Sequence, residues 1–200
     1  MKNEEKRVKR LMMMRAVQRD GEADDGKMIV EGYAAVFSKP TVLWKSDWSG
    51  TTYMEQIEPE AFASTNMDAT ILNYNHGDGA MVLASAKNGT LSMTTDETGL
   101  KITAEIADTT AGRDIYTLIK RGDLDKMSFA FDITSQTYEE NTEDKTCLRK
   151  ITGIGNLYDV SVVNFPAYDD TSIEARAAQY FRTQEAKERE RRHRLALLAL

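Results

Sequence analysis

The feature that most constrains the fold is a series of short segments in which apolar and polar residues alternate, separated by turn signals. In residues 127–134 every second residue is methionine, phenylalanine or isoleucine, and Ser128 lies on the opposite face of an extended chain. The pair Asn88-Gly89 is a strong signal for a tight turn between two such segments. Strands are predicted at residues 28–37, 53–57, 70–74, 81–86, 91–95, 100–106, 127–134, 148–154 and 157–163.

Few segments have helical spacing. Residues 110–121 place Ile115, Leu118 and Ile119 on one face, and Gly122 follows as a C-terminal stop. Pro59 opens a short helix, and a capping-box pattern at residues 171–174 begins a last one. The pattern predicts an α+β, mostly β fold: an antiparallel β-barrel or sheet surrounded by a few helices.

The chain length of 200 residues suits one domain flanked by tails. Residues 1–26 are basic and Met-rich at first and lack a sustained apolar face, so we expect a flexible N-terminal arm. The folded domain is expected over residues 27–181. Residues 182–200 form a charged segment, which we interpret as a helical C-terminal tail.

Charge and composition exclude several classes of protein. The tails are basic, and residues 20–181 with 195–200 hold 13 basic and 27 acidic residues, which disfavours duplex nucleic acid as the ligand. One cysteine and two histidines exclude an internal disulfide and an ordinary zinc cluster, and we expect neither a metal nor another cofactor. No apolar stretch approaches about 18 residues, so we expect a soluble intracellular protein.

Three residues could carry chemistry. His76 follows the strand at residues 70–74 and is the only histidine in the expected folded domain. A serine nucleophile needs such a base, and the base needs a group that fixes its tautomer; Ser128 and Asp159 could fill these roles. The residues alone leave other interpretations open: Ser128 as a packing residue, His76 as a turn residue, and Asp159 as a backbone cap.

A resemblance favours the catalytic interpretation. An ordered set of segments is similar to the prohead (capsid maturation) proteases of tailed bacteriophages: EGYAAVF at residues 31–37, EQIEPEAF at 55–62, Asn75-His76, DETGL at 96–100, KMSFAF at 126–131 and DVSVVNFPAY at 159–168. The resemblance covers about residues 28–176. It implies a fold similar to the herpesvirus assemblin serine proteases, a β-barrel surrounded by helices.

The resemblance also implies roles for residues. Ser128 is then the nucleophile and His76 the general base, and residues 27–181 are the protease domain. Herpesvirus relatives use a second histidine as third member, whereas the phage family uses an acidic residue, here Asp159. Backbone amides at Ala167 and Tyr168 are the expected oxyanion donors, by similarity to a loop of the herpesvirus enzymes.

The implied function is that of a serine endopeptidase in the host cytoplasm, inside the viral procapsid. Its expected substrates are scaffold segments of the major capsid protein and the protease itself. The resemblance leaves open whether activity needs a homodimer. The alternative is a catalytically inactive capsid assembly or scaffold protein that uses the same barrel as a binding module. A nucleic-acid-binding barrel is third, because the body lacks interleaved basic and aromatic residues.

Overall fold

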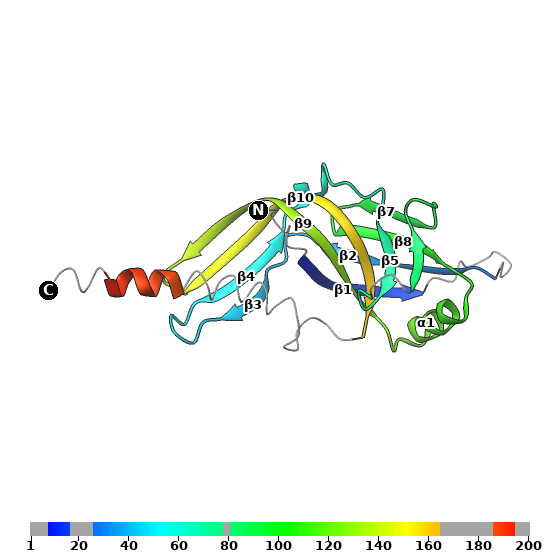
Figure 1. Cartoon of the computed structure of the whole chain (residues 1–200), viewed down its shortest axis with the longest axis horizontal. Coiled ribbons are helices and arrows are strands. Elements are labelled where there is room, and N and C mark those ends of the chain that lie inside the picture. Colours follow the sequence, from blue (N-terminus) through cyan, green and yellow to red (C-terminus); the bar gives the residue numbers. More distant parts are fainter. Residues whose placement is uncertain (1–7, 17–25, 78–80, 165–185, 195–200) are drawn as a thin grey trace.

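The computed structural model describes residues 8–16, 26–77, 81–164 and 186–194. Two long neighbouring strands run through the centre of its sheet (Figure 1). β9 (Lys126–Asn141) and β10 (Thr146–Val163) pair antiparallel along nearly their whole lengths. β10 also pairs in parallel with β4 (Thr52–Ile57) toward its start and with β5 (Ile71–Tyr74) toward its end. β10 therefore connects the two ends of the molecule.

The strands form one open network in the order β3-β4-β10-β9-β1-β2-β8-β7, with β5 and β6 branching from β10. The strands not yet introduced are β1 (Val8–Ala16), β2 (Met28–Val36), β3 (Thr41–Lys45), β6 (Val82–Ser85), β7 (Leu91–Thr95) and β8 (Gly99–Ile106). The predicted mostly β class is confirmed. Over the described residues, however, β3 and β7 end the path without pairing with each other, so no barrel closes. Two of the pairings are parallel rather than antiparallel.

The flexible arm expected at residues 1–26 is wrong for residues 8–16. These residues form β1, which pairs antiparallel with β9 on one side and β2 on the other. Leu11 lies opposite Ser128, and Met14 lies opposite Gly32. The basic, Met-rich segment lacks the alternation that marks a strand, and its partner β9 is more than a hundred residues away. A local pattern could not show this pairing.

The two strands predicted at residues 148–154 and 157–163 are one continuous strand, β10. The register between β9 and β10 shifts around Gly153 and Gly155, as at a β-bulge. A Cβ atom on Gly155 would lie 2.6 Å from Asp132 Oδ2, so the two strands approach too closely there for a larger residue. The polar stretch at residues 138–145 extends both strands into a hairpin instead of leaving the sheet.

The predicted helix over residues 110–121 is confirmed as α1 (Thr110–Arg121). The Thr109 side chain accepts a hydrogen bond from the Gly112 N–H, and Gly122 ends the helix at φ 80°. Pro59 opens the short 3₁₀ helix η1 (Pro59–Phe62). Residues 186–194 form a helix within the expected C-terminal tail. The helix predicted from residue 171 lies outside the described residues.

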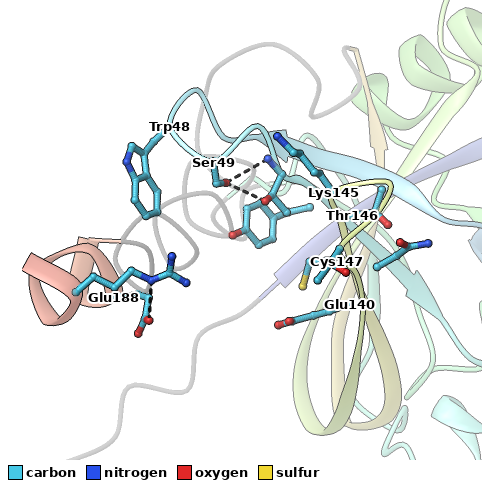
Figure 2. Close-up of a pocket in the computed structure, with 12 residues that line it drawn as sticks. Trp48, Ser49, Glu140, Lys145, Thr146, Cys147 and Glu188 are labelled. Carbon is cyan, nitrogen blue, oxygen red and sulfur yellow. Dashed lines mark hydrogen bonds and ion pairs between the residues drawn. The ribbon is translucent and has the colours of Figure 1, made fainter. Parts of the chain in front are cut away.

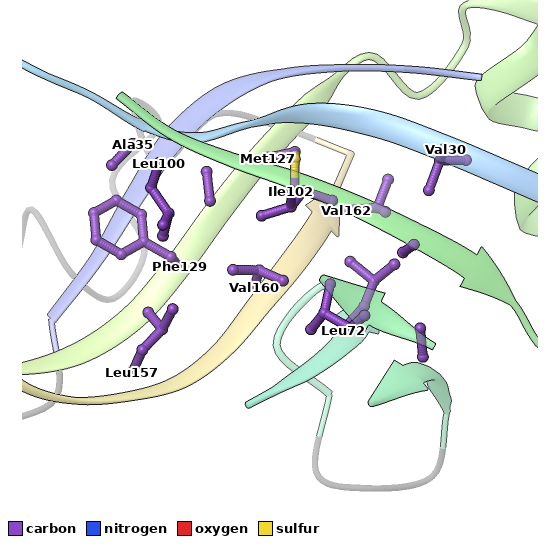
Figure 3. Close-up of a cluster of buried hydrophobic side chains, with 14 of the residues drawn as sticks. Val30, Ala35, Leu72, Leu100, Ile102, Met127, Phe129, Leu157, Val160 and Val162 are labelled. Atoms are coloured by element: carbon purple, nitrogen blue, oxygen red, sulfur yellow. The ribbon is translucent and has the colours of Figure 1, made fainter. Parts of the chain in front are cut away.

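The hydrophobic core lies under the sheet segment that carries the candidate residues (Figure 3). Met127, Phe129 and Phe131 on β9 are fully buried, and the two phenylalanine rings stack with centroids 4.7 Å apart. Val160 and Val162 of β10 pack in the same cluster. Each fully buried side chain of this size contributes about 1.5–3 kcal/mol, so this segment is a rigid platform for the polar residues between them.

The described residues lack two kinds of feature. None of their helices is long and apolar enough to cross a membrane. Nor do they contain a group of three or more histidine, cysteine, aspartate or glutamate residues that could hold a metal ion.

Candidate active site

A turn with unusual backbone angles directs His76 toward β10. Asn75 and His76 follow β5 with φ values of 52° and 53°, in the left-handed region, which asparagine and histidine occupy more often than most residues. The Asn75 N–H donates to the Val162 carbonyl at 2.8 Å, which ties the turn to β10. Such backbone angles cost about 1–3 kcal/mol and persist where surrounding contacts impose them, often at functional sites.

His76 and Asp159 are in direct contact. The distance from His76 Nδ1 to Asp159 Oδ1 is 2.6 Å, and both side chains are largely buried. The parallel pairing of β5 with β10 creates the contact. Asp159 lies opposite Ile71, and the turn after β5 brings His76 back to the seam, the boundary between β5 and β10. A carboxylate only accepts hydrogen bonds, so this contact places the ring proton on Nδ1 and leaves a lone pair on Nε2.

The second ring nitrogen of His76 has no partner. Within the described part of the chain, Nε2 is buried and makes no hydrogen bond. An unpaired buried polar atom is costly and uncommon in native proteins. At this position it has the geometry of a base whose substrate or nucleophile has yet to form its hydrogen bond.

Ser128 lies on the adjacent strand. It is 3% exposed and pairs in register with Ser161 of β10, so both side chains are on the same face of the sheet. Among the described residues, no side-chain hydrogen bond joins Ser128 to His76. The structure thus brings two of the three predicted residues into contact and places the third in register one strand away.

Two further polar residues at this site were not predicted as functional. Ser161 is fully buried, and its Oγ lies 2.7 Å from Asp159 Oδ1 and 3.1 Å from His76 Nδ1. Asn73 of β5 is also buried, and its side chain contacts the Ser161 hydroxyl. The sequence carries one signal: Asp159 and Ser161 share a strand face. A serine in an apolar strand is usually a packing residue, so the sequence alone did not single out Ser161.

The predicted oxyanion donors, Ala167 and Tyr168, lie outside the described residues, so their role stays a prediction.

A pocket of about 550 Å³ lies elsewhere, beside the tip of the β9–β10 hairpin (Figure 2). Trp48 from the loop between β3 and β4, Cys147 from β10, and Glu188 from the C-terminal helix are among its lining residues. None of the three predicted catalytic residues lines it. Its volume therefore gives no information on the catalytic site.

A His–Asp pair with an unpartnered ring nitrogen, next to a strand that carries a buried serine, is typical of serine hydrolases. The family model of the caudovirus prohead serine proteases matches residues 14–186, and the chain belongs to this family. No curated protein and no solved structure matches the chain. Membership supports a serine protease of capsid maturation, and it implies a location within the procapsid and an interaction with capsid protein. The likeness to the herpesvirus fold stays a prediction.

Proposed function

We propose that the chain is a serine endopeptidase that cleaves scaffold segments of the major capsid protein, and its own chain, inside the prohead of the infected host cell. One observation carries the proposal: His76 is held through Nδ1 by Asp159, and its buried Nε2 has no hydrogen-bond partner among the described residues. A ring oriented in this way can accept a proton at one defined atom.

In the proposed cycle, Nε2 of His76 takes the proton of the Ser128 hydroxyl as Oγ attacks the scissile carbonyl. Asp159 stabilises the imidazolium, which then donates its proton to the leaving amine. Water attacks the acyl-enzyme, again with His76 as base, and releases Ser128. Backbone amides at Ala167 and Tyr168 are the proposed donors to the oxyanion.

Ser128 is a better candidate for the nucleophile than Ser161, although Ser161 is closer to the ring. Ser161 contacts Nδ1, the same nitrogen that faces Asp159, and its exposed fraction is zero. A hydroxyl on that side of the ring cannot transfer its proton to Nε2. Ser128 lies on the neighbouring strand β9, in register with Ser161 and on the same face of the sheet, so it is not tied to the Nδ1 side of the ring.

The pairing of β1 limits where self-cleavage can occur without loss of structure. Leu11 lies opposite Ser128 on the neighbouring strand, so loss of residues 8–16 would expose one edge of the strand that carries the nucleophile. We therefore propose that self-processing in the N-terminal region leaves residues 8–16 in the sheet. In the C-terminal tail, no described strand would be lost.

A fluorophosphonate probe tests the proposal, because it reacts with an activated serine and needs no known substrate. The wild-type protein is expected to be labelled at Ser128, located by mass spectrometry, and to cleave co-expressed capsid protein. Ser128→Ala should reduce both by about 10³-fold or more. Ser92→Ala, at an exposed serine of β7, is the matched control and should change neither.

Unchanged capsid-protein cleavage by Ser128→Ala would contradict the proposal. An unreactive wild-type protein, together with a Ser128→Ala variant that still supports shell assembly, would instead favour the inactive assembly protein.

A further inference from the structure

The hydroxyl of Ser161 is the centre of a buried hydrogen-bond network. It lies 2.7 Å from Asp159 Oδ1 and 3.1 Å from His76 Nδ1, and it accepts a hydrogen bond from the His76 backbone N–H at 3.2 Å. The Asn73 side chain contacts it from β5. Ser161 therefore touches the acid, the ring of the base and the backbone of the turn that carries the base.

The proton count of this network assigns a direction to each bond. A hydroxyl has one hydrogen, and a carboxylate can only accept, so the Ser161 proton is required by Asp159. The structure directs the Asn73 carbonyl oxygen at the hydroxyl, so Asn73 can be the donor only after rotation by 180° about its last side-chain bond, which places its NH₂ group at the contact. In this arrangement the chain of donors runs from Asn73 to Ser161 to Asp159.

The strand register explains why these groups meet. Asn73, Ser161 and Ser128 are opposite one another on β5, β10 and β9, so they form a row across the sheet. All three are buried polar residues, and burial of a polar group is unfavourable unless it forms a hydrogen bond, as Asn73 and Ser161 do with each other. A simple packing role needs only a small residue at 161 and does not require an amide at 73.

We infer that Ser161, oriented by Asn73, is a positioning residue that fixes the Asp159 carboxylate and the His76 ring relative to each other. The inference rests on the proposed function, since it assigns a purpose to the orientation of the ring. Without the Ser161 hydroxyl, the carboxylate loses a donor and the turn loses the acceptor for the His76 N–H. The ring then samples orientations in which Nε2 is not directed at the nucleophile.

The experiment compares Ser161→Ala with Thr70→Val. Thr70 is also fully buried at the same seam, where its hydroxyl donates to the Leu157 carbonyl at 2.7 Å, away from His76. Both variants remove one buried hydroxyl from this seam. Two quantities are measured: the rate of fluorophosphonate labelling, and the low-field proton NMR signal of the His76 Nδ1–H. The NMR variants carry His193→Gln, so that one histidine remains.

Ser161→Ala is expected to slow labelling roughly 10- to 100-fold, the effect of one lost hydrogen bond to a charged group, and to broaden the low-field signal. Ser161→Thr, which keeps the hydroxyl, should restore both, and Thr70→Val should change neither. Asn73→Ala acts on the same hydroxyl from β5. It should shift both measurements in the same direction, and it replaces Ser161→Ala if that variant does not fold.

Labelling by folded Ser161→Ala within about twofold of the wild type, or an equal loss in Thr70→Val, would overturn the positioning role. These results differ from failure of the proposed function, in which the wild-type protein itself is not labelled at Ser128. In that case the NMR signal still tests the inference: an unchanged signal in Ser161→Ala contradicts it, and a broadened one supports it.

Discussion

Replacement of Asp159 by asparagine tests the acid of the proposed triad at constant size. The contact between Asp159 Oδ1 and His76 Nδ1 is 2.6 Å long and largely buried, so it supports the imidazolium that forms during catalysis. A hydrogen bond between charged groups contributes about 1.5–3 kcal/mol, which corresponds to a rate factor of about 10 to 150. A second effect adds to this loss, because an asparagine NH₂ facing the ring favours the tautomer that protonates Nε2. The same change costs about 10⁴ in well-studied serine proteases.

We therefore expect Asp159→Asn to lower the rate of fluorophosphonate labelling at Ser128 by about 10²- to 10⁴-fold. Asp132→Asn is the matched control, because Asp132 is also 8% exposed and accepts a hydrogen bond from the Asn156 N–H on the neighbouring strand. This control should reduce stability but leave the labelling rate of the folded protein unchanged. Circular dichroism establishes the folded fraction of each variant. A loss of less than about threefold in folded Asp159→Asn would refute the reasoning, as would an equal loss in the control.

Two further predictions concern the hairpin end of β10. Arg149→Met removes the counter-charge of the fully buried Glu55 carboxylate, 3.3 Å away, and should lower the free energy of unfolding by about 3–5 kcal/mol in urea titrations. The adjacent Lys150→Met breaks an ion pair with Glu139, whose side chain is 61% exposed, and should cost less than about 1 kcal/mol; equal losses would contradict the assignment. Burial raises the pKa of the Cys147 thiol, so less thiolate is present at a given pH. The rate of its alkylation by iodoacetamide should therefore increase at a higher pH in the folded protein than in the urea-unfolded protein. Coincident pH profiles of the two rates would contradict this.

The sequence predicts the strands and α1 well where the pattern is local. Residues 127–134 alternate strictly and form the buried part of β9, and Gly122 ends α1 where the sequence places the stop. It fails where a strand depends on distant partners. β1 has no alternation of its own and is stabilised by pairing with β9 and β2. Two short strands merge into β10 because the pairing with β9 continues through the register shifts around Gly153 and Gly155, where the local pattern leaves a gap between two predicted strands.

At the candidate site, too, the sequence indicates which residues could be functional but not how they are arranged. His76 and Asp159 stand out because one is scarce and the other interrupts an apolar strand, and the structure brings them into contact. Ser161 does not stand out, because its importance comes from what lies opposite it. Nothing in the sequence indicates that β5 pairs in parallel with β10, which places Asn73 beside Ser161. The sequence indicates candidates for catalysis, but it does not indicate which residues would orient them.

The order in which the strands pair has a consequence for activity. Ser128, Asp159 and Ser161 lie on β9 and β10, which are consecutive strands of one hairpin, so these residues meet through pairing that is local in sequence. His76 is 85 residues from Ser161 and reaches the site only when β5 adds to β10. Closing so long a loop is entropically costly and is favoured only after the hairpin offers an edge to pair with. We therefore expect His76 to join Ser128 and Asp159 late in folding. A chain whose β5 has not docked would hold Ser128 without its proposed base, so the proposed activity depends on the assembled sheet.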